Sequence, residues 1–174
     1  LFIHGWGVDR RIWRQQYKYF KEKYQVMIID LPGHGHSSFE KTSLTGMAHD
    51  IREVLIHAGF SQFTSVASSM GGLVALKMFD LYPNTFKKMV FVGSVPKFAK
   101  ADDYPHGLDV ARIRKLHGQV ETHYPGIVEI FFRSLFTKEE KKTRRFKWLK
   151  IFRRDDHDNI PQKLALERIS ISRA

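Results

Sequence analysis

The chain has 174 residues, which is long enough for one domain with its own core or for one domain and a small insertion, and its 43% hydrophobic and 27% charged residues are ordinary for a globular protein. The absence of cysteine excludes disulfides and thiolate chemistry. Apolar runs are too short to cross a bilayer and no signal peptide precedes them, so we expect a cytoplasmic protein. The net charge of +11 favours anionic partners without identifying them.

Strand-like and helix-like segments alternate over the first half of the chain. Short apolar runs predict strands at 1–3, 26–29, 63–66 and 89–93. The second of these is expected to be buried on both faces, and the fourth is also expected to be buried. Helices are predicted at 9–23, 44–58 and 73–79. The alternation is typical of an α/β fold with a doubly wound parallel sheet, which binds ligands at the carboxyl ends of its strands.

Two of these helices carry an apolar stripe that should face the sheet. In the first helix the stripe is Ile12, Trp13, Tyr17 and Phe20. In the second it is Leu44, Met47, Ile51, Val54, Leu55 and Ala58. We expect both stripes to lie in the core.

Residues 66–72 have the pattern of a tight turn from strand to helix with a serine at its apex. Such a turn, a nucleophile elbow, strains its serine and tolerates only small residues two positions to either side. Ser69 has Ala67 and Gly71 at those positions, whereas Ser68 has bulkier neighbours, so Ser69 is the predicted nucleophile. Because Ala67 replaces the first glycine of G-x-S-x-G, an ordinary glycine-rich turn is an equal alternative for this motif alone.

Two backbone N–H groups are candidate oxyanion donors. One is that of Met70, at the start of the helix after the elbow. The other is that of Trp6, since the two glycines in His4-Gly5-Trp6-Gly7 let the backbone approach a ligand closely after the first strand. The alternative is that His4 and Trp6 only pack and hydrogen-bond in the core.

The loop at 30–38 contains two histidines between glycines. A metal site at His34 and His36 lacks a third ligand of suitable spacing, and loop histidines are usually solvated. We therefore expect no metal and no other cofactor.

Strand patterns end near residue 94. Helices are predicted at 107–123, 126–136, 138–153 and 161–170. We divide the chain into an α/β core at 1–98 and a helical lid at 99–174. Residues 138–154 contain nine basic residues against Glu139 and Glu140, interleaved with aromatic ones. A solvated face, a docking face for an acidic partner, and a nucleic-acid or membrane surface are the three interpretations, in that order.

Taken together, H-G-W-G, D-L-P-G-H-G-H-S and S-S-M-G-G, followed by a helical insertion, resemble the α/β-hydrolase superfamily over nearly the whole chain. H-G-W-G-V-D-R-R-I-W, the helix start at 71–75 and V-G-S-V-P at 92–96 are most similar to the pimeloyl-[acyl-carrier protein] methyl ester esterases of biotin synthesis. Other esterases and C–C bond hydrolases share much of this pattern and are the alternatives.

This resemblance implies that Ser69 attacks an ester carbonyl and that the Trp6 and Met70 N–H groups hold the oxyanion, with Trp6 also contacting the substrate. It implies an acyl channel lined by Phe131, Phe132 and Leu135. It further implies a substrate carried by acyl carrier protein, an acidic partner. The basic residues that would bind this partner are Arg144, Arg145, Arg153 and Arg154. We expect a monomer that binds neither membrane nor, in this interpretation, nucleic acid.

The superfamily's acid and histidine follow the nucleophile, each after a later strand. The histidines after Ser69 are His106, His117, His123 and His157, and none ends a predicted strand. The chain also begins inside a strand and ends without a turn signal. We therefore expect a fragment, the N-terminal two-thirds of a hydrolase, that has little or no esterase activity alone. The competing hypothesis is a non-catalytic basic protein that binds partners through residues 138–154.

Overall fold

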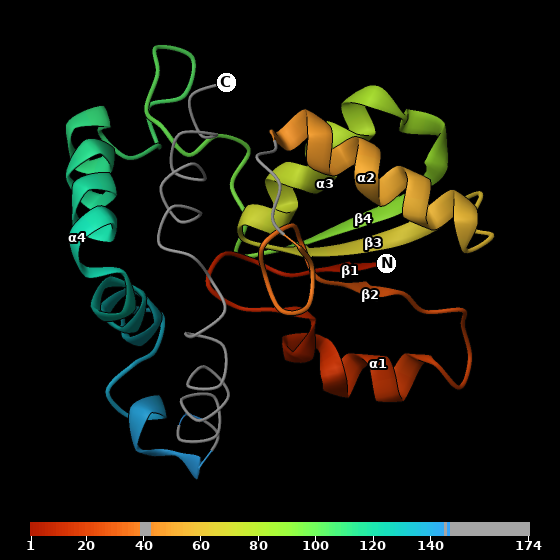
Figure 1. Ribbon diagram of the computed structural model, residues 1–174, viewed down its shortest axis with the longest axis horizontal. Helices are drawn as coiled ribbons and strands as arrows, with labels where there is room; N and C mark the ends of the chain where they lie inside the picture. The colour runs from red at the N-terminus through yellow and green to blue at the C-terminus, as the bar shows by residue number, and fades with distance from the viewer. Residues whose placement is uncertain (39–42, 145, 147–174) are drawn as a thin grey trace. The chain divides into compact units, whose positions relative to one another are not determined.

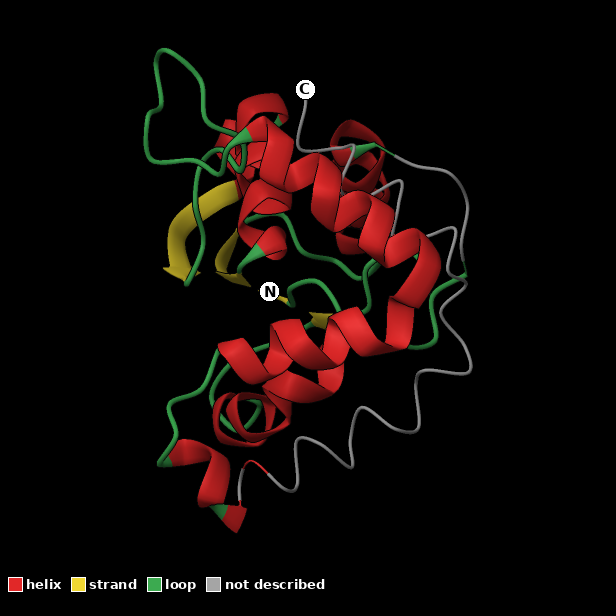
Figure 2. Ribbon diagram, turned by 90° about the vertical axis from the view of Figure 1, so that its left-hand side faces the viewer, coloured by secondary structure: helices red, strands yellow, loops and turns green. Residues whose placement is uncertain are grey.

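The computed structural model describes residues 1–38, 43–144 and 146. The chain divides into two compact units, Leu1–Phe98 and Ala99–Ala174. Figure 1 colours the first unit from red to yellow-green and the described part of the second from green to blue. Figure 2 shows the strands in yellow, and all four belong to the first unit.

A parallel sheet organises the first unit. Its strands are β1 (Phe2–Ile3), β2 (Ile28–Ile29), β3 (Phe63–Ser68) and β4 (Phe86–Val92). They lie in the order β2-β1-β3-β4, and every neighbouring pair is parallel. Because β1 lies between β2 and β3, the turns that follow these strands meet at one edge of the sheet.

Helices cover both faces of this sheet, which confirms the predicted doubly wound α/β fold. The 3₁₀ helix η1 (Arg10–Trp13) and helix α1 (Arg14–Phe20) lie on one face, and α2 (Leu44–His57) and α3 (Met70–Leu81) lie on the other (Figure 1). A short 3₁₀ helix, η2 (Pro83–Thr85), leads into β4. The ring centroids of Trp13 and Phe20 lie 5.2 and 6.0 Å from that of Phe2, so aromatic packing attaches η1 and α1 to β1.

The two helical stripes were predicted too broadly. On α2, Met47, Ala48, Ile51 and Leu55 are buried. Val54 and Ala58, expected in the core, are exposed, as is Tyr17 of α1. The reason is that a sheet contacts only the centre of a helical stripe, so residues at its margins remain in solvent.

Both outer strands differ from the prediction of full burial. Ile28 and Ile29 of β2 are only half-buried. On β4, Val90, Phe91 and Val92 are 42–47% exposed. An apolar run of strand length indicates a strand but carries no information on whether a neighbour covers each face and edge.

The second unit is built around one long, kinked helix. Helix α4 (Val110–Ser134) has non-helical backbone angles at His123, where the sequence predicts the boundary between two helices. The loop before it forms two isolated β-bridges, Ala99 with Leu108 and Ala101 with Tyr104, that the sequence did not predict.

The helix predicted from residue 138 is wrong at its start. A 3₁₀ helix, η3 (Glu140–Lys142), stands there, and Thr143 after it is extended. Half of that predicted helix, residues 145 and 147–153, and all of the one at 161–170 lie outside the described residues. None of the helices seen in the described part of the chain combines the length and hydropathy that spanning a bilayer requires.

The packing of α2 can be tested at two adjacent positions. Leu55→Ala should lower the free energy of unfolding by about 2–5 kcal/mol because it leaves a cavity under a side chain that is only 2% exposed. Val54→Ala is the matched control, and at 51% exposure it should change stability by no more than about 0.5 kcal/mol. Equal losses in urea unfolding would contradict the observed orientation of α2.

Candidate active site

Ser69 occupies a strained turn between β3 and α3. Its φ is 49° and its ψ is −119°, and it is the only non-glycine residue with positive φ in the part of the chain that the structure describes. An L-residue adopts such angles only when the surrounding structure imposes them. Its N–H donates to Val92 O at 3.0 Å, which ties the turn to the end of β4. The strain predicted for the apex of an elbow is therefore found at Ser69, and Ser68 is the last residue of β3.

Two glycines let the elbow contact the turn after β1. A Cβ at Gly5 would lie 3.0 Å from Ser69 Cβ and 3.6 Å from Ser69 Oγ. A Cβ at Gly71 would lie 2.5 Å from His4 O and 2.8 Å from Ile3 O. Each turn thus occupies the space that a side chain of the other would need. Sequence analysis placed both turns at one edge of the sheet, and the structure brings their backbones into contact.

The candidate oxyanion donors belong to these two turns. Trp6 follows Gly5 and is half-buried, and Met70 is the first residue of α3. The N–H groups of the first turn of a helix have no intrahelical partner, so Met70 N–H is available to a ligand in the manner that an oxyanion requires. Both donors are backbone N–H groups, so neither depends on the side chain that Trp6 or Met70 itself carries.

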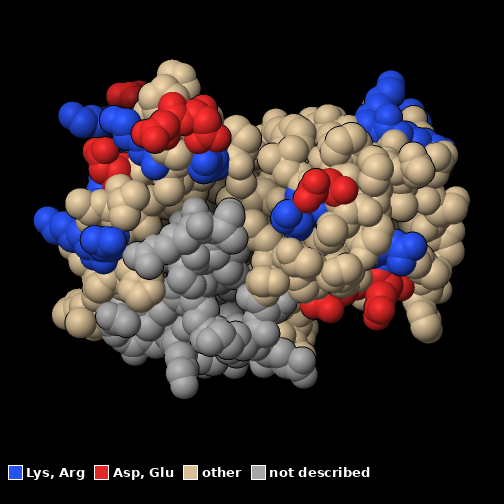
Figure 3. All heavy atoms as spheres, turned by 90° about the horizontal axis from the view of Figure 1, so that it is seen from above, with Lys and Arg blue, Asp and Glu red and all other residues tan. Residues whose placement is uncertain are grey.

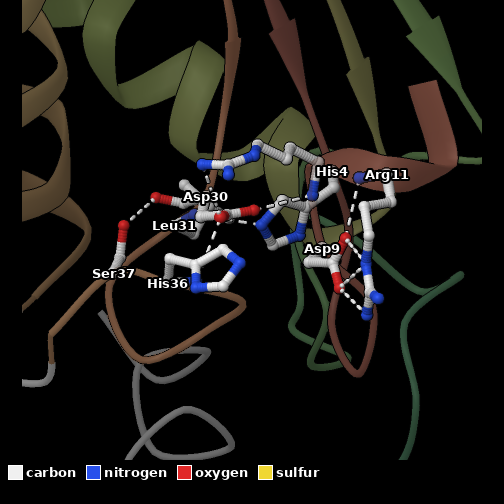
Figure 4. Close-up of polar contacts among 8 residues, drawn as sticks. His4, Asp9, Arg11, Asp30, Leu31, His36 and Ser37 are labelled. Carbon is white, nitrogen blue, oxygen red and sulfur yellow. Dashed lines mark hydrogen bonds and ion pairs between the residues drawn. The ribbon is translucent and has the colours of Figure 1, made fainter. Parts of the chain in front are cut away.

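His4 is fully buried and bridges two loops (Figure 4). Its Nε2 accepts the Leu31 N–H at 2.9 Å, and its Nδ1 lies 2.7 Å from Gly5 O. Because Nε2 is an acceptor, the imidazole proton is on Nδ1, which donates to Gly5 O. Both ring nitrogens thus have backbone partners, so His4 cannot receive the Ser69 proton. The interpretation that His4 hydrogen-bonds in the core is correct.

A buried carboxylate joins the loops that follow β1 and β2. The Asp30 side chain, 2% exposed, accepts the Arg10 N–H at 2.8 Å and the His36 N–H at 3.1 Å. The Arg10 guanidinium pairs with it at 3.1 Å. Gly35 has a φ of +52°, and a Cβ there would lie 2.4 Å from Asp30 Oδ2. These contacts satisfy a carboxylate whose burial would otherwise be costly.

A second buried carboxylate, Asp9, binds a residue close to it in the segment that follows β1. It accepts the Arg11 N–H at 2.7 Å and pairs with the Arg11 guanidinium, also at 2.7 Å (Figure 4). Sequence reasoning assigned no role to either aspartate. A signal was present for Asp30, which ends a predicted strand just before a loop of two glycines.

The prediction that the loop histidines are solvated is wrong for His34. That side chain is buried, and its ring centroid lies 4.8 Å from that of His4, edge to face. His36 is exposed. The sequence could not anticipate that the loop folds inward at His34, because this depends on a contact with His4, which is remote in sequence. Among the described residues, no three His, Asp or Glu side chains are grouped so as to hold a metal ion.

The residues predicted to line an acyl channel belong to the second unit. Phe132 is buried, with its ring centroid 5.2 Å from that of Phe136 and 6.5 Å from that of Phe146. Phe131 and Leu135 are exposed. They are four residues apart in sequence and so lie on one side of the helix end.

The remaining sequence candidates are placed only in part. Arg144 is exposed. The other three candidate arginines, Arg145, Arg153 and Arg154, and also His157, lie outside the described residues. His106 is in the exposed loop before α4, and His117 and His123 are on α4.

Replacement of Gly71 by alanine should disrupt the contact between the two turns. The new Cβ would meet backbone oxygens, which cannot rotate away, so we expect a loss of at least about 1–3 kcal/mol in the free energy of unfolding. Gly118→Ala is the control, because a Cβ added to that helical glycine would meet no heavy atom of a neighbouring segment within 4 Å, and alanine should add about 0.5–1 kcal/mol there. Urea unfolding measures both, and a neutral Gly71→Ala would contradict the close approach.

Known proteins resemble this chain in sequence and in fold. The family model described as the alpha/beta hydrolase fold matches residues 1–126. The chain is 27% identical over 150 residues to a pimeloyl-[acyl-carrier protein] methyl ester esterase of Wigglesworthia glossinidia brevipalpis, covering 86% of this chain and 56% of that protein. It is 28% identical over 134 residues to the karrikin insensitive 2 receptor IA of Petunia hybrida, covering 74% of this chain and 49% of that protein.

Solved structures agree on the fold. An esterase from Exiguobacterium antarcticum superimposes with a TM-score of 0.87 at 23% identity, over 99% of this chain and 65% of that one. The chain spans about half the length of the curated relatives it matches. Since the family model covers most of the chain and the backbone agrees with it, this chain belongs to the α/β-hydrolase fold family.

Proposed function

We propose that the whole protein is a serine carboxylesterase that hydrolyses an acyl methyl ester, with Ser69 as its nucleophile. The observation that carries the proposal is the strained backbone of Ser69, held between a parallel strand and a helix start and against the turn after β1. Strain of this kind is retained where it positions a reactive group. The esterase names of relatives and of a structural neighbour support the same reaction class.

In the proposed reaction, Ser69 Oγ attacks the ester carbonyl carbon while its proton passes to a general base. The carbonyl oxygen gains negative charge, which the N–H groups of Trp6 and Met70 stabilise. The tetrahedral intermediate then collapses, and the methoxide leaving group takes the proton from the base and departs as methanol. Water hydrolyses the acyl-serine in a second cycle, which releases the acid and free Ser69.

The general base and its acid partner are not assigned to residues of this chain. His4 is excluded because both of its ring nitrogens bond backbone groups. A serine hydroxyl without a base is a weak nucleophile at neutral pH. We therefore expect the 174 residues by themselves to have little or no esterase activity, and we propose turnover only for the whole protein.

We propose a medium-length acyl chain, with pimeloyl-[acyl-carrier protein] methyl ester as the first substrate to test. This choice of substrate is taken from the names of relatives of the chain. The lid role of the second unit belongs to the same proposal. Phe131 and Leu135, which are exposed four residues apart at the end of α4, would contact methylene groups, and buried Phe132 would support this end of the helix by packing on Phe136. Trp6 would contact the ester end of the substrate.

An acidic carrier protein is the proposed macromolecular partner. The chain's net charge of +11 attracts an acidic protein over a long range at low salt. In Figure 3, Lys and Arg side chains lie next to Asp and Glu side chains on the side that is drawn. Docking therefore requires particular residues, and exposed Arg144 is the described candidate.

A receptor without turnover is the second candidate function. A relative of similar identity is named a receptor, so membership of the family does not by itself decide between hydrolysis and binding. The two candidates differ in one measurable respect, because only the esterase consumes its ligand.

Ser69→Ala in the whole protein should lower kcat by at least about 10⁴-fold, because it removes the attacking oxygen while leaving the fold intact. Ser68→Ala is the matched control and should stay within about threefold of the unsubstituted protein, since Ser68 belongs to the strand. Hydrolysis of pimeloyl-[acyl-carrier protein] methyl ester and of p-nitrophenyl butyrate measures both. An active Ser69→Ala variant would refute the nucleophile, whereas tight binding of an intact ester would favour the receptor.

Arg144→Glu should raise KM for the carrier-bound ester by about 2- to 10-fold, because it reverses one exposed charge at the proposed docking site. The kcat/KM for p-nitrophenyl butyrate should not change, since this ester has no carrier. Lys88→Glu, on exposed β4 of the other unit, controls for net charge. If Lys88→Glu raised KM as much, Arg144 would have no specific role.

A further inference from the structure

We propose that His4 is a positioning residue that orients the oxyanion donor of Trp6. The proposal rests on the proposed esterase function and adds to it a residue that never touches the substrate. Its basis is a chain of contacts that runs from the Leu31 N–H to the His4 imidazole (Figure 4) and from the imidazole to the peptide between Gly5 and Trp6.

The His4 hydrogen bond matters for the oxyanion donor because its acceptor is Gly5 O. Gly5 O and Trp6 N–H belong to the same peptide group, which is planar and trans, so that its C=O and N–H point in opposite directions. Fixing the direction of Gly5 O therefore fixes the direction of Trp6 N–H. The 2.7 Å bond from Nδ1 sets that direction from the buried side.

The imidazole can fix the direction of Gly5 O because its other nitrogen, Nε2, is also hydrogen-bonded. Nε2 accepts the Leu31 N–H at 2.9 Å, so the ring is attached to the backbone immediately after β2. That backbone is itself fixed by Asp30, which binds N–H groups of both loops. The edge of the His34 ring packs 4.8 Å away, and His4 is fully buried, so the ring has little freedom to rotate.

The peptide after Gly5 needs the His4 bond to fix its orientation. A glycine peptide has wide rotational freedom, and a side chain that could restrict it is excluded by Ser69. The hydrogen bond from His4 supplies the restriction instead. Donation to Gly5 O also polarises the peptide, which makes the Trp6 N–H a better donor as charge develops on the substrate.

Two substitutions separate positioning from general stability, because each keeps one of the two His4 bonds. An asparagine amide nitrogen can replace Nδ1 as donor to Gly5 O, and a glutamine amide oxygen can replace Nε2 as acceptor from Leu31. Each variant loses one buried hydrogen bond, so both should lower the Tm by similar amounts. A merely structural role predicts equal effects on catalysis as well.

Positioning predicts unequal effects. In the whole protein, His4→Gln should lower kcat for p-nitrophenyl butyrate by about 10- to 100-fold with KM nearly unchanged, since an oxyanion donor acts in the transition state. His4→Asn should retain kcat within about threefold. Equal loss in both variants at equal Tm, or full activity of His4→Gln, would overturn the proposal.

A measurement without turnover tests the same bond. In ¹⁵N-histidine-labelled protein at neutral pH, His4 should show a protonated Nδ1 and an unprotonated Nε2. A proton on Nε2 would overturn the proposal even if neither variant folded. Failure of the esterase itself is recognised separately, because it would leave Ser69→Ala as active as the unsubstituted protein while the His4 tautomer stayed as expected.

Discussion

The site depends on one steric constraint. Where the turn after β1 meets the elbow after β3, neither turn leaves room for a side chain on the glycine of the other. Gly5 leaves room for Ser69, and Gly71 leaves room for the carbonyl oxygens of Ile3 and His4. Backbones that approach this closely cannot move independently, because any shift of one produces a clash with the other. The strained angles of Ser69 persist for the same reason, since β3, α3 and the bond to Val92 O fix both sides of the turn.

Buried polar side chains then hold the loops that surround this contact. His4, Asp9 and Asp30 are each almost fully buried, and each has backbone N–H or C=O partners that compensate for the loss of water. Backbone partners have fixed positions, so such bonds define loop geometry better than contacts between two mobile side chains would. Buried hydrogen bonds thus hold the loops of the candidate site, although strands β1 and β2 are very short.

Local sequence was sufficient to predict the strands and helices of the first unit and the elbow, but not which side chains neighbouring segments cover. Small residues at Ala67 and Gly71 identified Ser69 as the strained apex because the restriction is local and steric. Exposure of Val54 and of Val90 was missed because it depends on neighbours remote in sequence. His34 was missed for the same reason. The role of Asp30 depends on contact between the loops after β1 and β2. The alternation of strands and helices predicts that these loops lie at the same edge of the sheet, but not which of their residues are in contact.

The separation between backbone and side-chain roles explains how one family can include proteins with different names. In the proposed oxyanion site, both donors are N–H groups, and the conditions that place them fall on Gly5, Gly71 and His4 rather than on the side chains of Trp6 and Met70. Those two side chains, together with the second unit, can therefore change without altering the donors. In the proposed function, attack by Ser69 and stabilisation of the oxyanion depend on the first unit, and Phe131 and Leu135 of the second unit are the proposed contacts of the acyl chain. One fold can carry different functions, and the relatives of this chain accordingly include one named an esterase and one named a receptor.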